Sequence, residues 1–215
     1  MKSEYNIAVI GELKGCIETS LEVLVKRYFS VGKVFPLVNS EDEIESVMFS
    51  GKPVHATVID EFDWRQVDIA FFMTDIETTL KWADIASEYC VVIDNSGAFA
   101  ADESVPLVQI DVNEETLGRY SESNKIAIPG SEAAQLNLAI KQLHQEVGLV
   151  RVNVASYHAV SAAGKAGVTT LAGETARLLN AKGIEPSLFP QQTAFNVIPQ
   201  LGELDAQGDA LSELR

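Results

Sequence analysis

The hydrophobic positions of the first 130 residues fall into short runs separated by segments of helical periodicity. The runs are rich in β-branched and aromatic residues, which is typical of strands buried on both faces. They occupy residues 6–11, 31–38, 54–59, 69–72, 90–94, 107–110 and 126–128. Between them, segments 19–27 and 76–88 carry apolar residues at helical spacing. Strands that alternate with helices predict an α/β fold, with an N-terminal, doubly wound and mostly parallel sheet.

A parallel sheet binds its ligands at the edge where the strands end. In this chain the segments after Gly11, Phe72, Asn95 and Pro129 lie at such strand ends. We therefore expect any binding or catalytic residues of the first domain to come from these segments.

One strand end leads into a helix at a hydroxyl residue. After Pro129 and Gly130, an Ala- and Leu-rich helical pattern begins at Ser131 and runs to about Val147, where Gly148 ends it. The Ser131 hydroxyl has two interpretations. It can be a nucleophile, since helix starts favour anions and activated nucleophiles, or it can be an N-cap that accepts a backbone N–H. The pattern leaves both open, and the N-cap is the commoner of the two.

The pattern changes after residue 148. Residues 150–160 alternate apolar and polar positions, which predicts a strand with one solvated face. A helix is expected over 161–179, an irregular Pro-bounded segment over 189–201, and an amphipathic pattern begins in the last ten residues and stops. A chain that ends inside such a pattern looks truncated. We predict a boundary between about 130 and 150, which gives domains 1–130 and 131–215.

Composition restricts the class of partner. The 215 residues are 47% hydrophobic and carry a formal net charge of −15, which argues against binding to nucleic acid or to anionic membranes. The sequence has no apolar run of 18 residues and no secretory leader pattern, so we expect a cytoplasmic protein. Cys16 and Cys90 have no zinc or redox spacing, and we expect reduced, mostly buried thiols and no metal site.

Three stretches resemble the aspartate-semialdehyde dehydrogenase family. The first, VVIDNSGAF at 91–99 with VPLV at 105–108, looks like the family's VVIDNSSAFR and VPLV. The second, SYHAVSAAGKAG at 156–167, looks like its STYQAVSGAG, and the third, PQQTAFNVIPQ at 190–200, looks like its PxQIAFNVIPH. The resemblance extends along nearly the whole chain.

The resemblance implies a Rossmann-type domain that binds NADP or NAD, followed by the first part of a mixed α/β domain that forms a homodimer. The implied reaction belongs to amino-acid biosynthesis. It is the reductive dephosphorylation of β-aspartyl phosphate through a cysteine thioester. In the family, a general acid/base histidine and an arginine for the substrate carboxylate come later in the chain than position 215.

Several site residues are carried over from the resemblance, and several differ. Ser131 stands at the position of the family's cysteine, and His158 stands at the position of its glutamine. A Ser131–His158 nucleophile and base pair is one interpretation, and a structural histidine is the other. By resemblance, the cofactor-binding residues are Gly11, Asn95, Ser161 and Gly164.

The family's nucleotide and phosphate motifs are altered at further positions. Lys14 and Ile17 replace glycines of the family's GATGAVG loop, although Lys14 could still pair with a phosphate. Ala100 replaces the arginine that binds substrate phosphate. Acidic residues at 41–43 would repel the 2′-phosphate of NADP, so no cofactor is assigned beyond the family's NADP or NAD.

These differences leave three hypotheses open. The first is a catalytically impaired or inactive homologue that is retained for dimerisation or for association with a partner. The second is an active NAD(P)-dependent oxidoreductase that acts on a semialdehyde or an acyl phosphate. The third is a module that binds another small anion in the same cleft.

Overall fold

The computed structural model describes residues 4–185 and 188–199. The chain forms two compact units, which divide between Gly148 and Leu149. The division into domains at residue 130, which the sequence suggests, stays a prediction. Four α-helices lie in the described residues: α1 (Glu18–Lys26), α2 (Ile76–Ser87), α3 (Ser131–Val147) and α4 (Gly164–Leu179).

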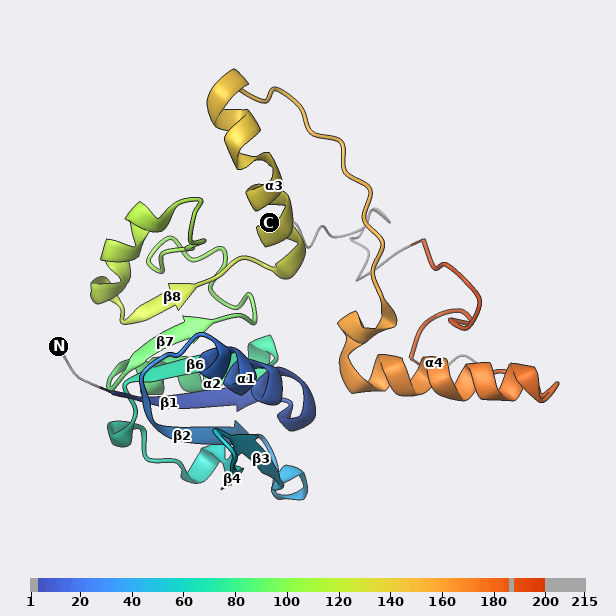
Figure 1. The fold of residues 1–215 in the computed structure, drawn as a ribbon, viewed down its shortest axis with the longest axis horizontal. Helices are drawn as coiled ribbons and strands as arrows, with labels where there is room; N and C mark the ends of the chain where they lie inside the picture. The colour runs from blue at the N-terminus through green and yellow to red at the C-terminus, as the bar shows by residue number, and fades with distance from the viewer. Residues whose placement is uncertain (1–3, 186–187, 200–215) are drawn as a thin grey trace. The chain divides into compact units, whose positions relative to one another are not determined.

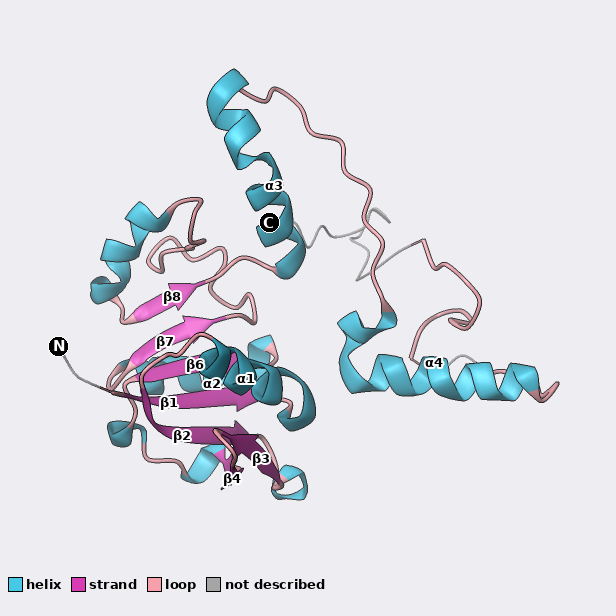
Figure 2. Cartoon of the chain, in the orientation of Figure 1, coloured by secondary structure: helices cyan, strands magenta, loops and turns pink. Residues whose placement is uncertain are grey.

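A six-stranded parallel sheet forms the centre of the first unit (Figures 1 and 2). The strand order is β5-β2-β1-β6-β7-β8, and every pairing between neighbours is parallel. The predicted α/β, Rossmann-type fold is thus confirmed. The strands are β1 (Tyr5–Gly11), β2 (Val31–Val38), β5 (Thr57–Val58), β6 (Ile69–Met73), β7 (Val91–Asp94) and β8 (Lys125–Ala127).

Strand β1 is buried on both faces, and its alternate residues belong to two separate cores. Ile7 and Val9 join a cluster that includes Leu21 of α1. Ala8 and Ile10 join a second cluster that includes Ala83 of α2. Helices α1 and α2 therefore cover opposite faces of the sheet, which makes it doubly wound.

The predicted strand 54–59 is wrong as a single element. Its first part belongs to a hairpin of β3 (Ser46–Phe49) and β4 (Lys52–His55), and only Thr57 and Val58 pair with the sheet. Ser50 and Gly51 join the hairpin strands with positive φ angles of 48° and 76°. Two-residue turns of this kind match the twist of a hairpin, and the Ser-Gly pair was a signal for one.

The expected strand 107–110 is reduced to a single bridge between Leu107 and Ala127. Asn113 ends this segment early, because its side-chain oxygen accepts the N–H of Gln109 at 2.7 Å. A 3₁₀ helix over Glu114–Glu122 follows Asn113.

The predicted strand 150–160 is wrong, since the structure gives residues 150–159 no strand pairing. Val150 is fully exposed, and Val152 and Val154 are about half exposed. Alternation of apolar and polar residues describes two faces, but a strand also needs a neighbour to accept its backbone hydrogen bonds. Within the described part of the chain, no segment supplies that neighbour.

The rest of the second unit follows the sequence more closely. Helix α4 begins at Gly164 after a 3₁₀ turn over Val160–Ala163, three residues later than expected. Residues 188–199 contain no helix or strand, as expected for an irregular segment. The amphipathic pattern of the last ten residues lies outside the described residues.

The two cysteines differ in environment. Cys90 is buried as expected, and burial raises the pKa of its thiol to about 12, with a smaller contribution from Asp68. Cys16 is exposed, so the expectation of a buried thiol is wrong there. It lies in the turn after β1, where Leu13 and Ile17 take the inward positions.

Thiol titration checks this assignment. We expect one fast equivalent with an aromatic disulfide reagent at pH 8 in the native protein, and a second only after unfolding. At that pH, a thiol with the pKa of Cys90 carries about three orders of magnitude less thiolate than an ordinary cysteine. The Cys16→Ser variant should lose the fast equivalent, and a fast equivalent that persists would contradict the assignment.

Candidate functional site

The candidate site lies at the carboxyl ends of β1 and β6. From β1 the chain moves to β2 on one side, and from β6 it moves to β7 on the other. Strand order therefore reverses between β1 and β6, and open α/β sheets bind ligands in the crevice at such a point. Gly11 ends β1 and pairs with Met73 at the end of β6. A paired strand end thus places Gly11 at this switch point.

Gly11 is required by close packing of the two strand ends. Its φ angle is +155°, and a Cβ atom at this position would lie 2.4 Å from the backbone carbonyl oxygen of Met73. No other residue fits there without a shift of the backbone. The glycine predicted for cofactor binding therefore also serves the packing of the sheet.

The loop after β1 departs from a phosphate-binding glycine loop. Leu13–Ile17 forms one π-helical turn, and Ile17 is fully buried beside the core. Lys14 is exposed and forms an ion pair with Glu45. A hydrogen bond from Lys14 to Glu45, together with the charge of Glu45, raises the pKa of the lysine. The ammonium considered for a phosphate is therefore already paired with a carboxylate.

The loop after β7 is wound around the buried carboxylate of Asp94. Its Oδ1 accepts the N–H of Ser96 at 2.7 Å and the hydroxyl of Ser96 at 2.6 Å, and its Oδ2 accepts the N–H of Phe99 at 3.0 Å. Asn95, predicted for cofactor binding, is exposed at the strand end, and its N–H donates to the carbonyl of Phe72 at 2.9 Å. Asp94 therefore fixes the backbone that presents Asn95.

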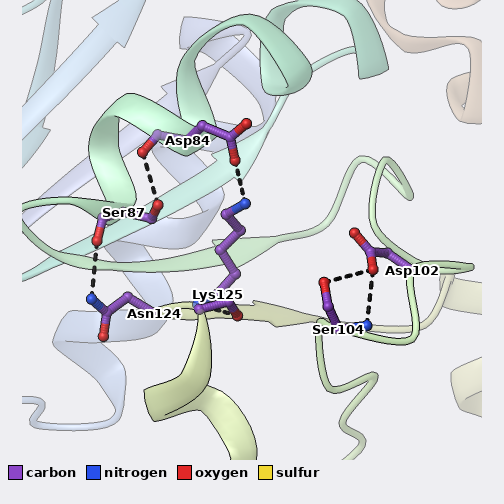
Figure 3. A network of polar contacts seen from close by, with 7 residues as sticks. Asp84, Ser87, Asp102, Ser104, Asn124 and Lys125 are labelled. Carbon is purple, nitrogen blue, oxygen red and sulfur yellow. Dashed lines mark hydrogen bonds and ion pairs between the residues drawn. The ribbon is translucent and has the colours of Figure 1, made fainter.

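Lys125 of β8 contacts both the same loop and α2, and Figure 3 shows its ion pair with Asp84. Its side chain is 13% exposed, pairs with Asp84 of α2, and places its ammonium 4.7 Å from the centre of the Phe99 ring. Sequence reasoning did not identify Lys125 or Asp94, because their partners are set by the tertiary fold.

Ala100 lies beside an open depression of about 420 Å³. Its charged lining residues are Asp102, Glu103 and Arg119. The Arg119 guanidinium donates to the carbonyl of Glu103 at 2.8 Å. The hydrogen bond from the Ser104 hydroxyl and that from its N–H hold the pKa of Asp102 below its usual range. Two carboxylates and one arginine make a poor phosphate site, since the carboxylates repel the anion.

Ser131 is the first residue of α3 and not its N-cap. Gly130 is the N-cap, with an extended backbone, and the structure records no side-chain capping bond. The N-cap interpretation of Ser131 is therefore wrong, since an N-cap residue lies just outside the helix and Ser131 lies inside it. Ser131 is exposed, and its hydroxyl remains available at the helix start.

Within the first unit, helix α3 is held by hydrogen bonds with the side chain of Gln109, which the sequence did not suggest. The Gln109 side chain donates to the carbonyl of Ala134 at 2.8 Å and accepts from the Asn137 amide at 3.1 Å. None of the residues of α3 is buried. The helix start is thus positioned by hydrogen bonds and not by a packed core.

The remaining predicted residues belong to the second unit. His158 is partly buried, and its Nε2 lies 2.9 Å from the hydroxyl of Ser156. Ser161 is exposed in the 3₁₀ turn before α4, and Gly164 begins α4 with a φ angle of +64° that favours glycine. The structure thus brings Gly11, Asn95 and Ser131 to strand ends of the first unit. The Ser131–His158 pair, which spans the two units, stays a prediction.

The second unit also contains a contact that the sequence did not reveal. Glu174 of α4 is 6% exposed, and its Oε2 accepts the N–H groups of Thr193 at 2.7 Å and Ala194 at 2.9 Å. This carboxylate fastens the irregular segment 188–199 to α4.

Among the residues that the structure describes, no group of three or more His, Cys, Asp or Glu side chains could hold a metal ion. None of the described helices is both long and apolar enough to cross a membrane.

The sheet, its switch point and the glycine at the end of β1 define the chain as a Rossmann-type nucleotide-binding fold. Residues 6–120 match the family model described as the NAD binding domain of semialdehyde dehydrogenase, and residues 140–215 match its dimerisation domain. The chain belongs to the aspartate-semialdehyde dehydrogenase family, as its relatives also show.

Two Vibrio proteins illustrate the relationship. Aspartate-semialdehyde dehydrogenase 2 of Vibrio cholerae is 41% identical over 216 residues, which cover the whole of this chain and 64% of the relative. Aspartate-semialdehyde dehydrogenase of Vibrio mimicus is 40% identical, over the whole chain and 68% of that relative. The chain therefore spans about two thirds of the length of these relatives.

Solved structures support the same family assignment. The crystal structure of aspartate-semialdehyde dehydrogenase II from Vibrio cholerae has a TM-score of 0.92 and 42% identity, over 96% of this chain and 62% of that one. A probable aspartate-semialdehyde dehydrogenase from Pseudomonas aeruginosa has a TM-score of 0.89 and 32% identity, with the same coverage of both chains. The family resemblance seen in the sequence is confirmed.

Asp94 and Asp102 form a matched pair that tests the role of burial. Each carboxylate accepts the N–H and the hydroxyl of a serine two residues later, but Asp94 is fully buried and Asp102 is exposed. We expect Asp94→Ala to lower the free energy of unfolding by about 1–3 kcal/mol, because the buried N–H of Phe99 loses its acceptor. Asp102→Ala should leave the urea midpoint unchanged, and equal effects of the two variants would contradict this account.

Proposed function

We propose that this chain is an aspartate-semialdehyde dehydrogenase homologue whose catalysis is strongly impaired or lost, and that it is retained for homodimerisation or association with a partner. The proposal is carried by Ser131, which is the first residue of α3 and which the family resemblance aligns with the catalytic cysteine. A cysteine at a helix start is a thiolate near neutral pH, whereas a serine hydroxyl does not ionise there and needs an adjacent base.

The second support is the loss of a phosphate-binding arginine. Ala100 stands at its position, and the depression beside Ala100 is lined by Asp102 and Glu103 as well as Arg119. An arginine supplies charge-assisted and often bidentate hydrogen bonds to phosphate, each contributing about 1.5–3 kcal/mol. The acyl phosphate would meet a weaker and partly repulsive site.

The third support is the altered nucleotide loop. Ile17 fills a core position, and Lys14 is paired with Glu45. The exposed acidic turn Glu41–Glu43 follows β2, where NADP enzymes accommodate the 2′-phosphate. If a nicotinamide cofactor still binds, NAD is therefore favoured over NADP.

Homodimerisation is supported by the match of residues 140–215 to a dimerisation domain. Apolar side chains remain exposed over the beginning of that range: Leu143, Val147, Val150, Val152 and Val154. Exposed apolar side chains in a segment that matches a dimerisation domain favour contact with a second copy. We propose that a second copy covers part of it.

An active oxidoreductase of the same family is the second candidate. It is favoured by the match of residues 6–120 to an NAD-binding domain and by the Rossmann-type sheet. In this case Ser131 or His158 would have a different role, and the cofactor or substrate would have changed.

An activity assay separates the two. We expect phosphate-dependent oxidation of aspartate semialdehyde with NADP or NAD to be at least about 10³-fold slower than in the Vibrio cholerae relative, which serves as positive control. The Ser131→Cys variant should remain inactive, because Ala100 and the nucleotide loop are unchanged in it. Turnover of the unaltered protein at the rate of the relative would refute the proposal, and strong activity of Ser131→Cys alone would show that only the nucleophile was lost.

A further inference from the structure

A hydrogen bond joins the segments that follow β2 and β6, between two residues 39 positions apart in the sequence. The side-chain amide of Asn39, the first residue after β2, donates to the hydroxyl oxygen of Thr78 at 3.1 Å. Thr78 lies in the first turn of α2, the helix that follows β6.

Sheet order fixes where this bond lies. Strand β1 is hydrogen-bonded to β2 on one side and to β6 on the other (Figure 1). The ends of β2 and β6 are therefore two strand spacings apart, roughly 9.5 Å. A contact between Asn39 and Thr78 must cross the end of β1, beside the switch point where a nucleotide binds in this fold.

The bond is part of a longer polar chain that ends on a charge. The Thr78 hydroxyl donates to Asp75 Oδ2 at 2.8 Å, and the N–H of Thr78 donates to Asp75 Oδ1 at 2.8 Å. These bonds hold the pKa of Asp75 below its usual value. With its proton directed to Asp75, the Thr78 oxygen presents its lone pairs to Asn39, and such chains strengthen each member.

The backbone of Asn39 is hydrogen-bonded as well as its side chain. Its backbone N–H donates to Glu43 Oε2 at 3.3 Å, so that the turn after β2 folds back on the strand end. The Lys14–Glu45 ion pair is a second tie, between the loop after β1 and the segment after β2. Both ties are exposed to solvent, and of the two it is the Asn39–Thr78 bond that joins the segments after β2 and β6.

We propose that the Asn39–Thr78 hydrogen bond is a latch that closes the nucleotide crevice of this chain and must open before a dinucleotide can enter. This inference rests on the proposed function, since it explains why a nucleotide-binding fold would not engage its cofactor. It adds that the crevice beneath the latch remains able to bind the adenosine half of a nucleotide.

Calorimetric titration of the full chain with NAD tests the latch. Asn39→Ala and Thr78→Val each remove the bond, and both should bind NAD about 2- to 12-fold more tightly than the unaltered protein. That range corresponds to the net contribution of one neutral hydrogen bond, which binding would no longer have to break. Thr78→Ser keeps the hydroxyl and should bind as the unaltered protein does.

A control variant breaks a similar bond elsewhere. Asn124→Ala removes an exposed side-chain amide bond to the carbonyl of Ser87, which precedes β7 and lies away from the crevice, and it should not change NAD affinity. Hydrogen exchange gives a second measurement. The backbone amide of residue 39 should exchange faster in Asn39→Ala and Thr78→Val than in Thr78→Ser.

The outcomes are decisive in both directions. Tighter NAD binding in both opened variants, with unchanged binding in Thr78→Ser and Asn124→Ala, supports the latch. Equal or weaker affinity in the opened variants, or no binding in any variant at 10 mM NAD, overturns it. Catalysis is a separate measurement, which tests the proposed function and not the latch. An opened variant that binds NAD without turnover agrees with the proposed loss of catalysis. Turnover by the unaltered protein would refute that loss, whereas the latch is decided by the NAD affinities.

Discussion

The parallel pairing of β1 with β2 on one side and β6 on the other is the constraint on which the rest of the first unit depends. With both edges hydrogen-bonded and both faces apolar, β1 requires a helix layer on each side, and α1 and α2 supply them. The same pairing brings Gly11 against the Met73 carbonyl and places the switch point of the sheet at these two strand ends. Core packing and site position are therefore consequences of one arrangement.

Local patterns were sufficient to predict most of the sheet and its helices. The runs 31–38 and 69–72 and the helix over Ile76–Ser87 carry their periodicity within a few residues, so no distant partner is needed to recognise them. The segment 150–160 shows the limit of this reasoning. Its alternation is that of a strand, yet pairing depends on a neighbour that the sequence pattern cannot supply.

The features of the candidate site also fall into two groups, those that local sequence signals predict and those that depend on the tertiary fold. Gly11, Asn95 and Ser131 could be placed at strand ends from motif and turn signals alone. The Asn39–Thr78 bond joins two residues that are 39 positions apart in the sequence, and the Lys125–Asp84 pair joins two that are 41 apart. Only the folded chain brings these residues together. The predicted N-cap at Ser131 was wrong by one position. The N-cap is Gly130 of the Pro-Gly turn, which lies one residue before the hydroxyl that suggested the cap.

The buried carboxylate of Asp94 has a consequence for how this chain can diverge. The loop that follows β7 is shaped from within, by bonds from its own backbone to Asp94 and by the Lys125 ammonium over the Phe99 ring. The Ala100 side chain takes part in none of these contacts. The residue at position 100 can therefore change while the loop keeps its form, because the contacts that shape the loop are made by its neighbours.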